Sequence, residues 1–157
     1  MKTEKEQNYH SAIVVNSSVN EIFEKISDVP GWWAQNFEGS AKKLGDKFTV
    51  RFGETWVIFQ ISELIPGKKV AWDVVDCYLP WLNDKTEWTG TTVVFEVYQK
   101  DGSAVINMTH VGLVPSVECY ENCEKGWDRY IKESLFKFIT EGKGIPALDG
   151  RQREEAQ

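Results

Sequence analysis

One long amphipathic stretch near the C-terminus, Val117 to Thr140, most constrains what this chain can fold into. Its apolar residues recur at steps of three and four, at Tyr120, Cys123, Trp127, Ile131, Leu135 and Phe138. This spacing puts them on one face of a helix. Ser116 is a suitable N-cap and Gly142 a suitable stop, which predicts one helix roughly 35 Å long. Such a helix needs a large apolar partner surface.

Six upstream segments are expected to supply that surface as β-strands. They are rich in β-branched and aromatic residues and are bounded by turn residues. They run from Tyr9 to Val15, Lys47 to Phe52, Trp56 to Leu64, Lys69 to Val75, Thr91 to Tyr98 and Ala104 to Val111. The short links between most of them, such as Lys100-Asp101-Gly102, predict antiparallel pairing.

Between the first two strands, Val19 to Ser27 has helical spacing, and Trp32 and Trp33 follow on a short helical turn or in a loop. Asp76 to Gly90 is a long loop rich in aromatic residues. The predicted fold class is therefore α+β. A curved antiparallel sheet of about six strands wraps around the long C-terminal helix, with two short helices after the first strand.

Length and charge limit the other possibilities. With 157 residues the chain predicts one domain, residues 9–144, between a disordered N-terminus, 1–8, and a flexible tail, 145–157. A net charge of −6 without a basic block argues against nucleic acid as a partner. No apolar window could span a membrane and no signal peptide is evident, so we expect a cytoplasmic protein.

The residues with reactive side chains do not form a familiar catalytic motif. There is no glycine-rich phosphate loop, no GxSxG and no HExxH, so we predict no catalytic residue, no cofactor and no metal, and lean towards a protein without enzyme activity. Cys119 and Cys123 share a helical face and could bind zinc with Cys77 or His110, but two core thiols explain them better. A disulfide within one helical turn is not expected.

His110 ends an apolar strand, which leaves two interpretations open. It could face a cavity as an acid, a base or a ligand contact. Alternatively it is a structural histidine whose ring nitrogens bond backbone groups near Gly112, which the absence of a visible nucleophile–base pair favours.

Several motifs, in order, resemble the SRPBCC (START-like) helix-grip superfamily. Within it they resemble the family named for activators of the ninety-kilodalton heat-shock chaperone ATPase. The resemblance covers about Tyr9 to Gly144. The matching parts are Val15 to Phe23, Trp32-Trp33, Leu44 to Phe48, Ile61 to Lys68, Val70-Ala71-Trp72, Trp88-Thr89-Gly90-Thr91, Thr109 to Leu113, Cys123 to Trp127 and Ser134-Leu135. The most distinctive of the later ones are Trp88-Thr89-Gly90-Thr91 and Thr109 to Leu113.

The resemblance implies an apolar cavity between the sheet and the long helix that binds a small hydrophobic, lipid-like or aromatic molecule. The cavity candidates are Trp33, Phe52, Trp56, Phe59, Trp72, Trp88, Phe95, Met108, His110, Trp127 and Ile131. Trp56 and Phe59 have opposite parity on one strand, so both face the helix only if a bulge intervenes. The resemblance also leaves open a chaperone-binding role and a polyketide-cyclase-like enzyme, and a role in stress.

Overall fold

The computed structural model describes residues 7–147 of the chain and contains one antiparallel sheet of seven strands against a long helix. The elements are β1 (Tyr9–Val15), α1 (Val19–Ser27), α2 (Val29–Trp32), β2 (Phe37–Gly39), β3 (Lys47–Phe52), β4 (Thr55–Ile65), β5 (Lys69–Tyr78), β6 (Thr92–Lys100), β7 (Ser103–Val111), α3 (Tyr120–Asp128), a π-helical turn η1 (Arg129–Leu135) and α4 (Phe136–Glu141). This confirms the α+β prediction and adds the short strand β2, in a region that the sequence assigned to a loop.

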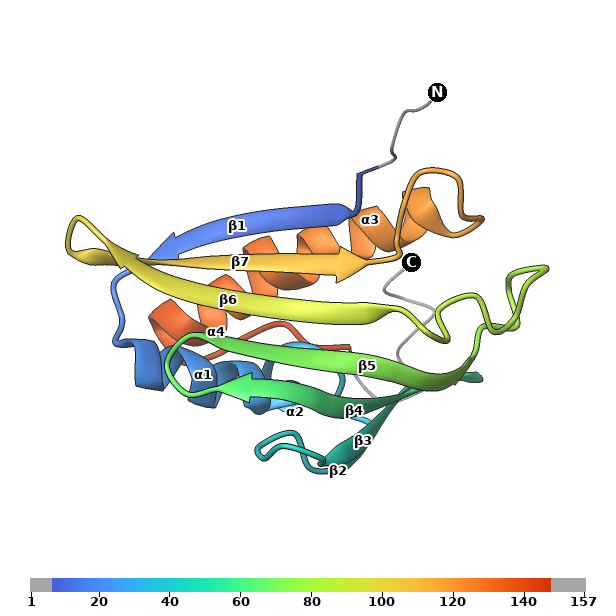
Figure 1. Ribbon diagram of the computed structural model, residues 1–157, viewed down its shortest axis with the longest axis horizontal. Coiled ribbons are helices and arrows are strands. Elements are labelled where there is room, and N and C mark those ends of the chain that lie inside the picture. The colour runs from blue at the N-terminus through green and yellow to red at the C-terminus, as the bar shows by residue number, and fades with distance from the viewer. Residues whose placement is uncertain (1–6, 148–157) are drawn as a thin grey trace.

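The strand order is β1-β7-β6-β5-β4-β3-β2, a meander except that β1 returns beside β7. Figure 1 shows the sheet curving over the long helix, while α1 and α2 lie beside its lower strands. The hairpin between β6 and β7 has Asp101 at φ 54° and Gly102 at φ 83°. Positive φ at both central residues is the pattern that joins two twisted strands with a two-residue turn, as the sequence predicted.

Two irregularities decide which side chains of β4 and β5 face the helix. The pairing shifts between Ile61 and Glu63, so that Leu64 pairs with Val70 on the inner face. A second shift next to Phe59 adds a residue to β5 and leaves Val75 exposed. Such bulges change the parity of a strand without ending it, and simple alternation does not reveal them.

The long helix begins at Tyr120 rather than at Val117, and Cys119 takes the cap position predicted for Ser116. It ends as predicted at Gly142, which adopts φ 84°. Its centre is the turn η1. Cys123, Trp127, Ile131 and Leu135 follow one another at intervals of four residues. On an α-helix of 3.6 residues per turn, each interval of four rotates the side chain by about 40° away from the previous one. A locally wider turn keeps Ile131 and Leu135 buried on the sheet side.

The segment after the long helix returns to α2. Ser134, fully buried in η1, donates a hydrogen bond to the carbonyl of Trp32 at 2.6 Å and accepts one from the amide of Ile145 at 2.7 Å. Ala147 forms a parallel bridge with Ala34. Residues 145–147, assigned to the tail from the sequence, therefore pack on the domain. The predicted disorder of 1–8 and flexibility of 148–157 fall largely outside the described residues.

Candidate functional site

All the aromatic side chains chosen as cavity candidates except Trp56 form one connected cluster between sheet and helix. Trp33 lies 4.9 Å from Trp127 and 6.3 Å from Trp72, measured between ring centroids. Trp72 in turn contacts Phe59 at 5.5 Å and Phe95 at 5.0 Å. Offset and tilted ring pairs at these distances are stabilising beyond the apolar area that they bury. The rings therefore pack chiefly against one another.

The remaining inward candidates extend this cluster. Met108 and Ile131 are fully buried, and Phe52 is half-buried with its ring 5.8 Å from Trp33. Trp88 stacks on Trp127 at 6.1 Å. The role of these side chains as ligand contacts stays a prediction.

Trp56 is separated from the others. It pairs with Tyr78 across β4 and β5, and their rings lie 6.3 Å apart on the outer face of the sheet. Phe59, three residues along, is fully buried on the inner face. The opposite parity of the two positions is retained because the shift between Ile58 and Phe59 adds its extra residue to β5, and the one that adds a residue to β4 lies beyond both, between Ile61 and Glu63.

His110 is fully buried, and both of its ring nitrogens are used by neighbouring side chains. The indole N–H of Trp127 donates to Nδ1 at 3.1 Å. Because indole is only a donor, Nδ1 must be unprotonated, so a neutral ring carries its proton on Nε2. Nε2 then donates to the Thr91 hydroxyl at 2.8 Å, and that hydroxyl donates to the carbonyl of Trp88 at 2.7 Å.

Burial lowers the pKa of His110 to about 3, because an imidazolium ion in this apolar site would lose its hydration. The structural interpretation of this histidine is thus the one the geometry supports, although its partners are side chains rather than backbone groups near Gly112. A fully hydrogen-bonded, neutral ring without access to solvent is poorly suited to proton transfer.

Cys119 and Cys123 form a disulfide, contrary to the expectation from sequence. That expectation placed both in the helix, whereas Cys119 precedes its first residue. Their Cα atoms are 5.7 Å apart, within the range that disulfides span. Cys77 is a buried free thiol. In residues 7–147, no group of three His, Cys, Asp or Glu side chains is arranged to hold a metal ion.

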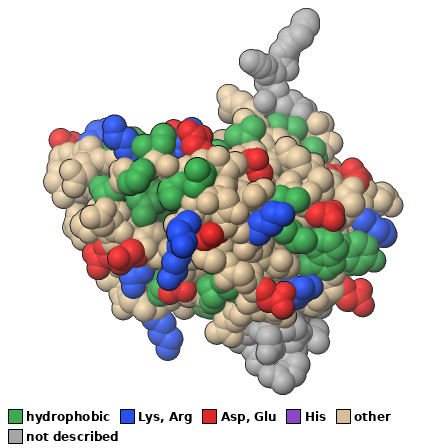
Figure 2. Space-filling model, turned by 60° about the horizontal axis from the view of Figure 1, so that its bottom comes forward, with side chains coloured by type: hydrophobic (Ala, Val, Ile, Leu, Met, Phe, Trp, Pro, Cys, Tyr) green, Lys and Arg blue, Asp and Glu red, His purple; other side chains and the backbone are tan. Residues whose placement is uncertain are grey.

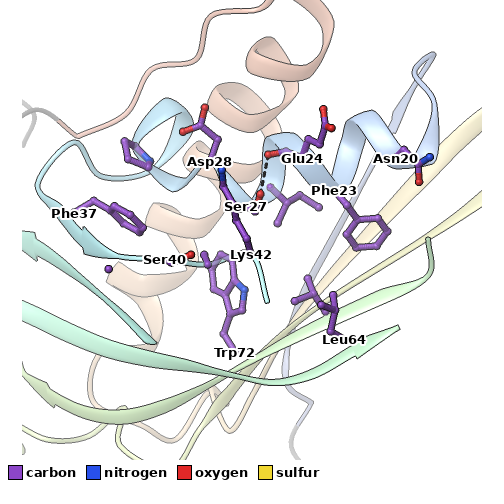
Figure 3. A pocket seen from close by; sticks show the side chains of 15 residues that line it. Asn20, Phe23, Glu24, Ser27, Asp28, Phe37, Ser40, Lys42, Leu64 and Trp72 are labelled. Carbon is purple, nitrogen blue, oxygen red and sulfur yellow. Dashed lines mark hydrogen bonds between the residues drawn. The ribbon is translucent and has the colours of Figure 1, made fainter. Parts of the chain in front are cut away.

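A pocket of about 970 Å³ opens between α1, the loop that follows β2, and the inner face of β4 and β5. Figure 3 shows Phe23 of α1 and Leu64 of β4 pointing towards each other, with Trp72 beside Leu64. Trp72 is the only one of the cavity candidates that lines it. The apolar lining residues are Phe23, Ile26, Pro30, Phe37, Ala41, Leu64, Val70 and Trp72.

The pocket also has polar lining residues, three of which are charged. Glu24 comes from α1, Asp28 follows its last residue, and Lys42 comes from the opposite loop. All three are exposed. A molecule in this pocket would contact both apolar side chains and charges of both signs.

The loop that forms the outer wall is fixed by Asp46. Its carboxylate accepts hydrogen bonds from the Ser40 hydroxyl at 2.7 Å and from the amides of Lys42 and Lys43 at 3.1 and 2.9 Å. The Ser40 bond is the main cause of a lowered Asp46 pKa. Gly39 adopts φ 103°, and a side chain there would collide with the Lys47 carbonyl. The wall is thus held in one conformation from within.

Sequence reasoning missed the residues that line this pocket other than Trp72. Phe23 was identified only as part of an amphipathic helix, and Leu64 only as the end of a strand. The available signal was the loop between Glu38 and Asp46, whose two glycines and Asp46 predict a defined turn beside the sheet edge. The inward direction of Leu64 depends on the bulge and has no sequence signal of its own.

The surface carries no segregated charge on the face seen in Figure 2, where acidic and basic side chains are interspersed. The net charge of the chain is −6. Within the described residues, no helix is both long and apolar enough to cross a membrane.

Comparison with known proteins gives matches at the level of structure alone. No family model matches the chain, and no curated protein matches it significantly. The solution structure of the Aha1 dimer from Colwellia psychrerythraea is 22% identical, with a TM-score of 0.70, over 87% of this chain and 98% of that one.

Two further solved structures are similar over most of the chain. SSP2350 from Staphylococcus saprophyticus is 16% identical, with a TM-score of 0.67, over 90% of this chain and 98% of that one. CalU16 from Micromonospora echinospora is 11% identical, with a TM-score of 0.61, over 83% and 73%. At such identities the likeness establishes the fold alone, so the chain has the helix-grip fold of these structures, as its sequence motifs predicted.

Proposed function

We propose that this protein binds a small, mainly apolar molecule in the pocket between α1 and the inner face of the sheet. The observation that carries the proposal is a pocket of about 970 Å³ that combines apolar lining residues with exposed charged ones. Ligand sites in proteins commonly measure about 300–1,000 Å³ and combine an apolar lining with a few polar groups.

The pocket uses the inner face of the sheet that the long helix also covers, but at the end covered by α1. The space against the long helix is occupied by the cluster of Trp33, Trp72 and Trp127. The ligand is therefore expected to have an apolar body that contacts Phe23, Leu64 and Trp72, and a polar group near Lys42 or Asp28.

Tryptophan emission and thermal unfolding of the whole chain test the proposal against a panel of fatty acids, steroids and polyphenols. A ligand at 100 times its Kd stabilises the folded state by about 2.7 kcal/mol. For a chain of this size this raises Tm by roughly 5–10 °C. If no member of the panel changes either the emission or Tm, the binding role is wrong.

A matched pair of variants locates the site. Phe23 lines the pocket, and Phe136 is an equally half-buried phenylalanine on the long helix, away from it. Loss of one aromatic contact weakens binding by about 1.5–3 kcal/mol, or roughly 10- to 100-fold. Phe23→Ser should show this loss and Phe136→Ser should not. Equal losses in the two variants would place the ligand elsewhere.

The other two roles have less support. A cyclase-like activity loses its acid–base candidate, because His110 is buried and both ring nitrogens are hydrogen-bonded. A chaperone partner is favoured only by the likeness to Aha1. Stimulation of the ninety-kilodalton chaperone ATPase by the purified chain would support that role, and absence of stimulation at saturating concentration would exclude it.

A further inference from the structure

The disulfide between Cys119 and Cys123 lies where the loop 79–91 meets the start of the long helix. We propose that this pair is a reversible thiol–disulfide site whose state controls how firmly that loop is held to the helix. The inference concerns a different end of the molecule from the pocket and does not rest on the proposed ligand.

Two carboxylates join the loop and the helix start reciprocally. Glu87 of the loop accepts hydrogen bonds from the amides of Glu118 at 3.1 Å and Cys119 at 3.0 Å. Glu118 accepts from the amides of Asn83, at 2.9 and 3.0 Å, and Asp84, at 3.3 Å. Hydrogen bonds to an ionised acceptor are stronger than neutral ones. Cys119 is therefore one of the residues through which the loop is attached.

The disulfide extends this attachment to the body of the helix. It ties Cys119, which precedes the helix, to Cys123, which lies inside it. When the bond is broken, Cys119 is held against the helix only by its backbone and by contacts such as the hydrogen bond from the Cys123 amide to its carbonyl, at 2.8 Å. The first turn and the loop can then open together at a lower free-energy cost.

Trp88 connects the same pair to the core. Its indole N–H donates to the sulfur of Cys119 at 3.3 Å. Its ring meets His110 edge-on at 4.7 Å and stacks on Trp127 at 6.1 Å. A disulfide in contact with an indole quenches the indole emission. Reduction of the Cys119–Cys123 bond should therefore increase the fluorescence of Trp88.

The chemical step is a thiol–disulfide exchange. A thiolate of a dithiol reductant attacks the sulfur of Cys123, which belongs to the less buried of the two residues at 8% exposure against 0% for Cys119. The S–S bond breaks, Cys119 leaves as a thiolate and takes up a proton, and a mixed disulfide forms. The second thiol of the reductant then releases Cys123, so two electrons and two protons are transferred in all. A small-molecule disulfide reverses the reaction by the same route.

Hydrogen exchange followed by mass spectrometry tests the inference on the whole chain, with dithiothreitol as the reductant and oxidised dithiothreitol or glutathione disulfide as the oxidant. Closing a short loop by a disulfide restricts the open state enough to predict exchange at least about tenfold faster in the reduced protein, over 79–91 and 117–123. Exchange in β3 and β4 should not change. Equal exchange in the two states overturns the proposal.

The third cysteine offers a matched control. Cys77→Ser should retain the full response, because Cys77 is a free thiol on β5. Cys123→Ser should exchange like the reduced protein and ignore the reductant. Alkylation of the oxidant-treated wild type gives a second readout that needs no variant. If Cys119 and Cys123 are both alkylated after unfolding of that sample, the pair does not form and the proposal is refuted.

Discussion

The burial of His110 predicts a loss of stability in mild acid. The pKa of this side chain is about 3 in the folded chain, against about 6.5 in an unfolded one. Between these values the unfolded state binds one more proton, so stability falls as the pH falls. The contribution of His110 is complete above about pH 6.5 and is lost progressively towards pH 3.

The magnitude follows from the two pKa values. Each pH unit between them changes the free energy of unfolding by 1.36 kcal/mol, so going from pH 7.5 to pH 5 costs about 2 kcal/mol through this one group. Urea denaturation at the two pH values measures the change. Carboxylates that titrate in the same pH interval change the free energy of unfolding equally in the wild type and in a His110 variant. The difference between the two proteins therefore isolates the contribution of His110.

His110→Asn is the informative variant. The amide oxygen of asparagine can replace Nδ1 as acceptor for Trp127, but it does not titrate. The wild type should lose about 2 kcal/mol more than this variant between pH 7.5 and pH 5. His10→Asn is the control, since His10 is exposed on β1 and its replacement should leave the full loss in place. Parallel losses in the wild type and His110→Asn, within about 0.5 kcal/mol, would refute the reasoning.

Two further predictions concern the segment that returns to α2. Ser134→Ala removes the hydroxyl that bonds both the Trp32 carbonyl and the Ile145 amide, and should lower the free energy of unfolding by about 1–3 kcal/mol. Thr140→Ala, which removes an exposed hydroxyl, should change it by less than about 0.5 kcal/mol. A side chain at Gly144 would lie 2.5 Å from the Gly31 carbonyl oxygen, so Gly144→Ala should destabilise by about 1–3 kcal/mol. Gly126→Ala, in open space on α3, should instead stabilise by about 0.5–1 kcal/mol. Urea denaturation measures each, and a stabilising Gly144→Ala would contradict the packing described here.

Most of the fold could be predicted because its signals are local. Strand β1 and strand β3 begin and end where alternation and turn residues place them, and Gly142 stops the long helix. Strand β2 was missed because three residues carry too little periodicity to be recognised. The sequence predicted a helix start at Val117, three residues too early. Glu118 suits the first turn of a helix, but in the structure its carboxylate accepts hydrogen bonds from the loop.

The site was harder to predict because it depends on contacts between distant segments. Whether Leu64 faces inward is decided by a bulge, and how Cys119 and Cys123 meet is decided by where the helix begins. An aromatic side chain is buried in the folded protein whether it contacts a ligand or another ring, so its residue type does not tell the two cases apart. Composition alone therefore could not distinguish the packed cluster from the open pocket.

The pairing of β1 with β7 also sets the order in which the protein can be completed. Tyr9 lies opposite His110, so the first strand to leave the ribosome waits for a partner made roughly 100 residues later, about 5–20 s at usual rates of synthesis. During that interval the apolar side of β1 has neither its neighbour in the sheet nor the long helix to cover it. Contacts so distant in sequence also slow folding of the finished chain. The sheet thus closes only after β7 has been made.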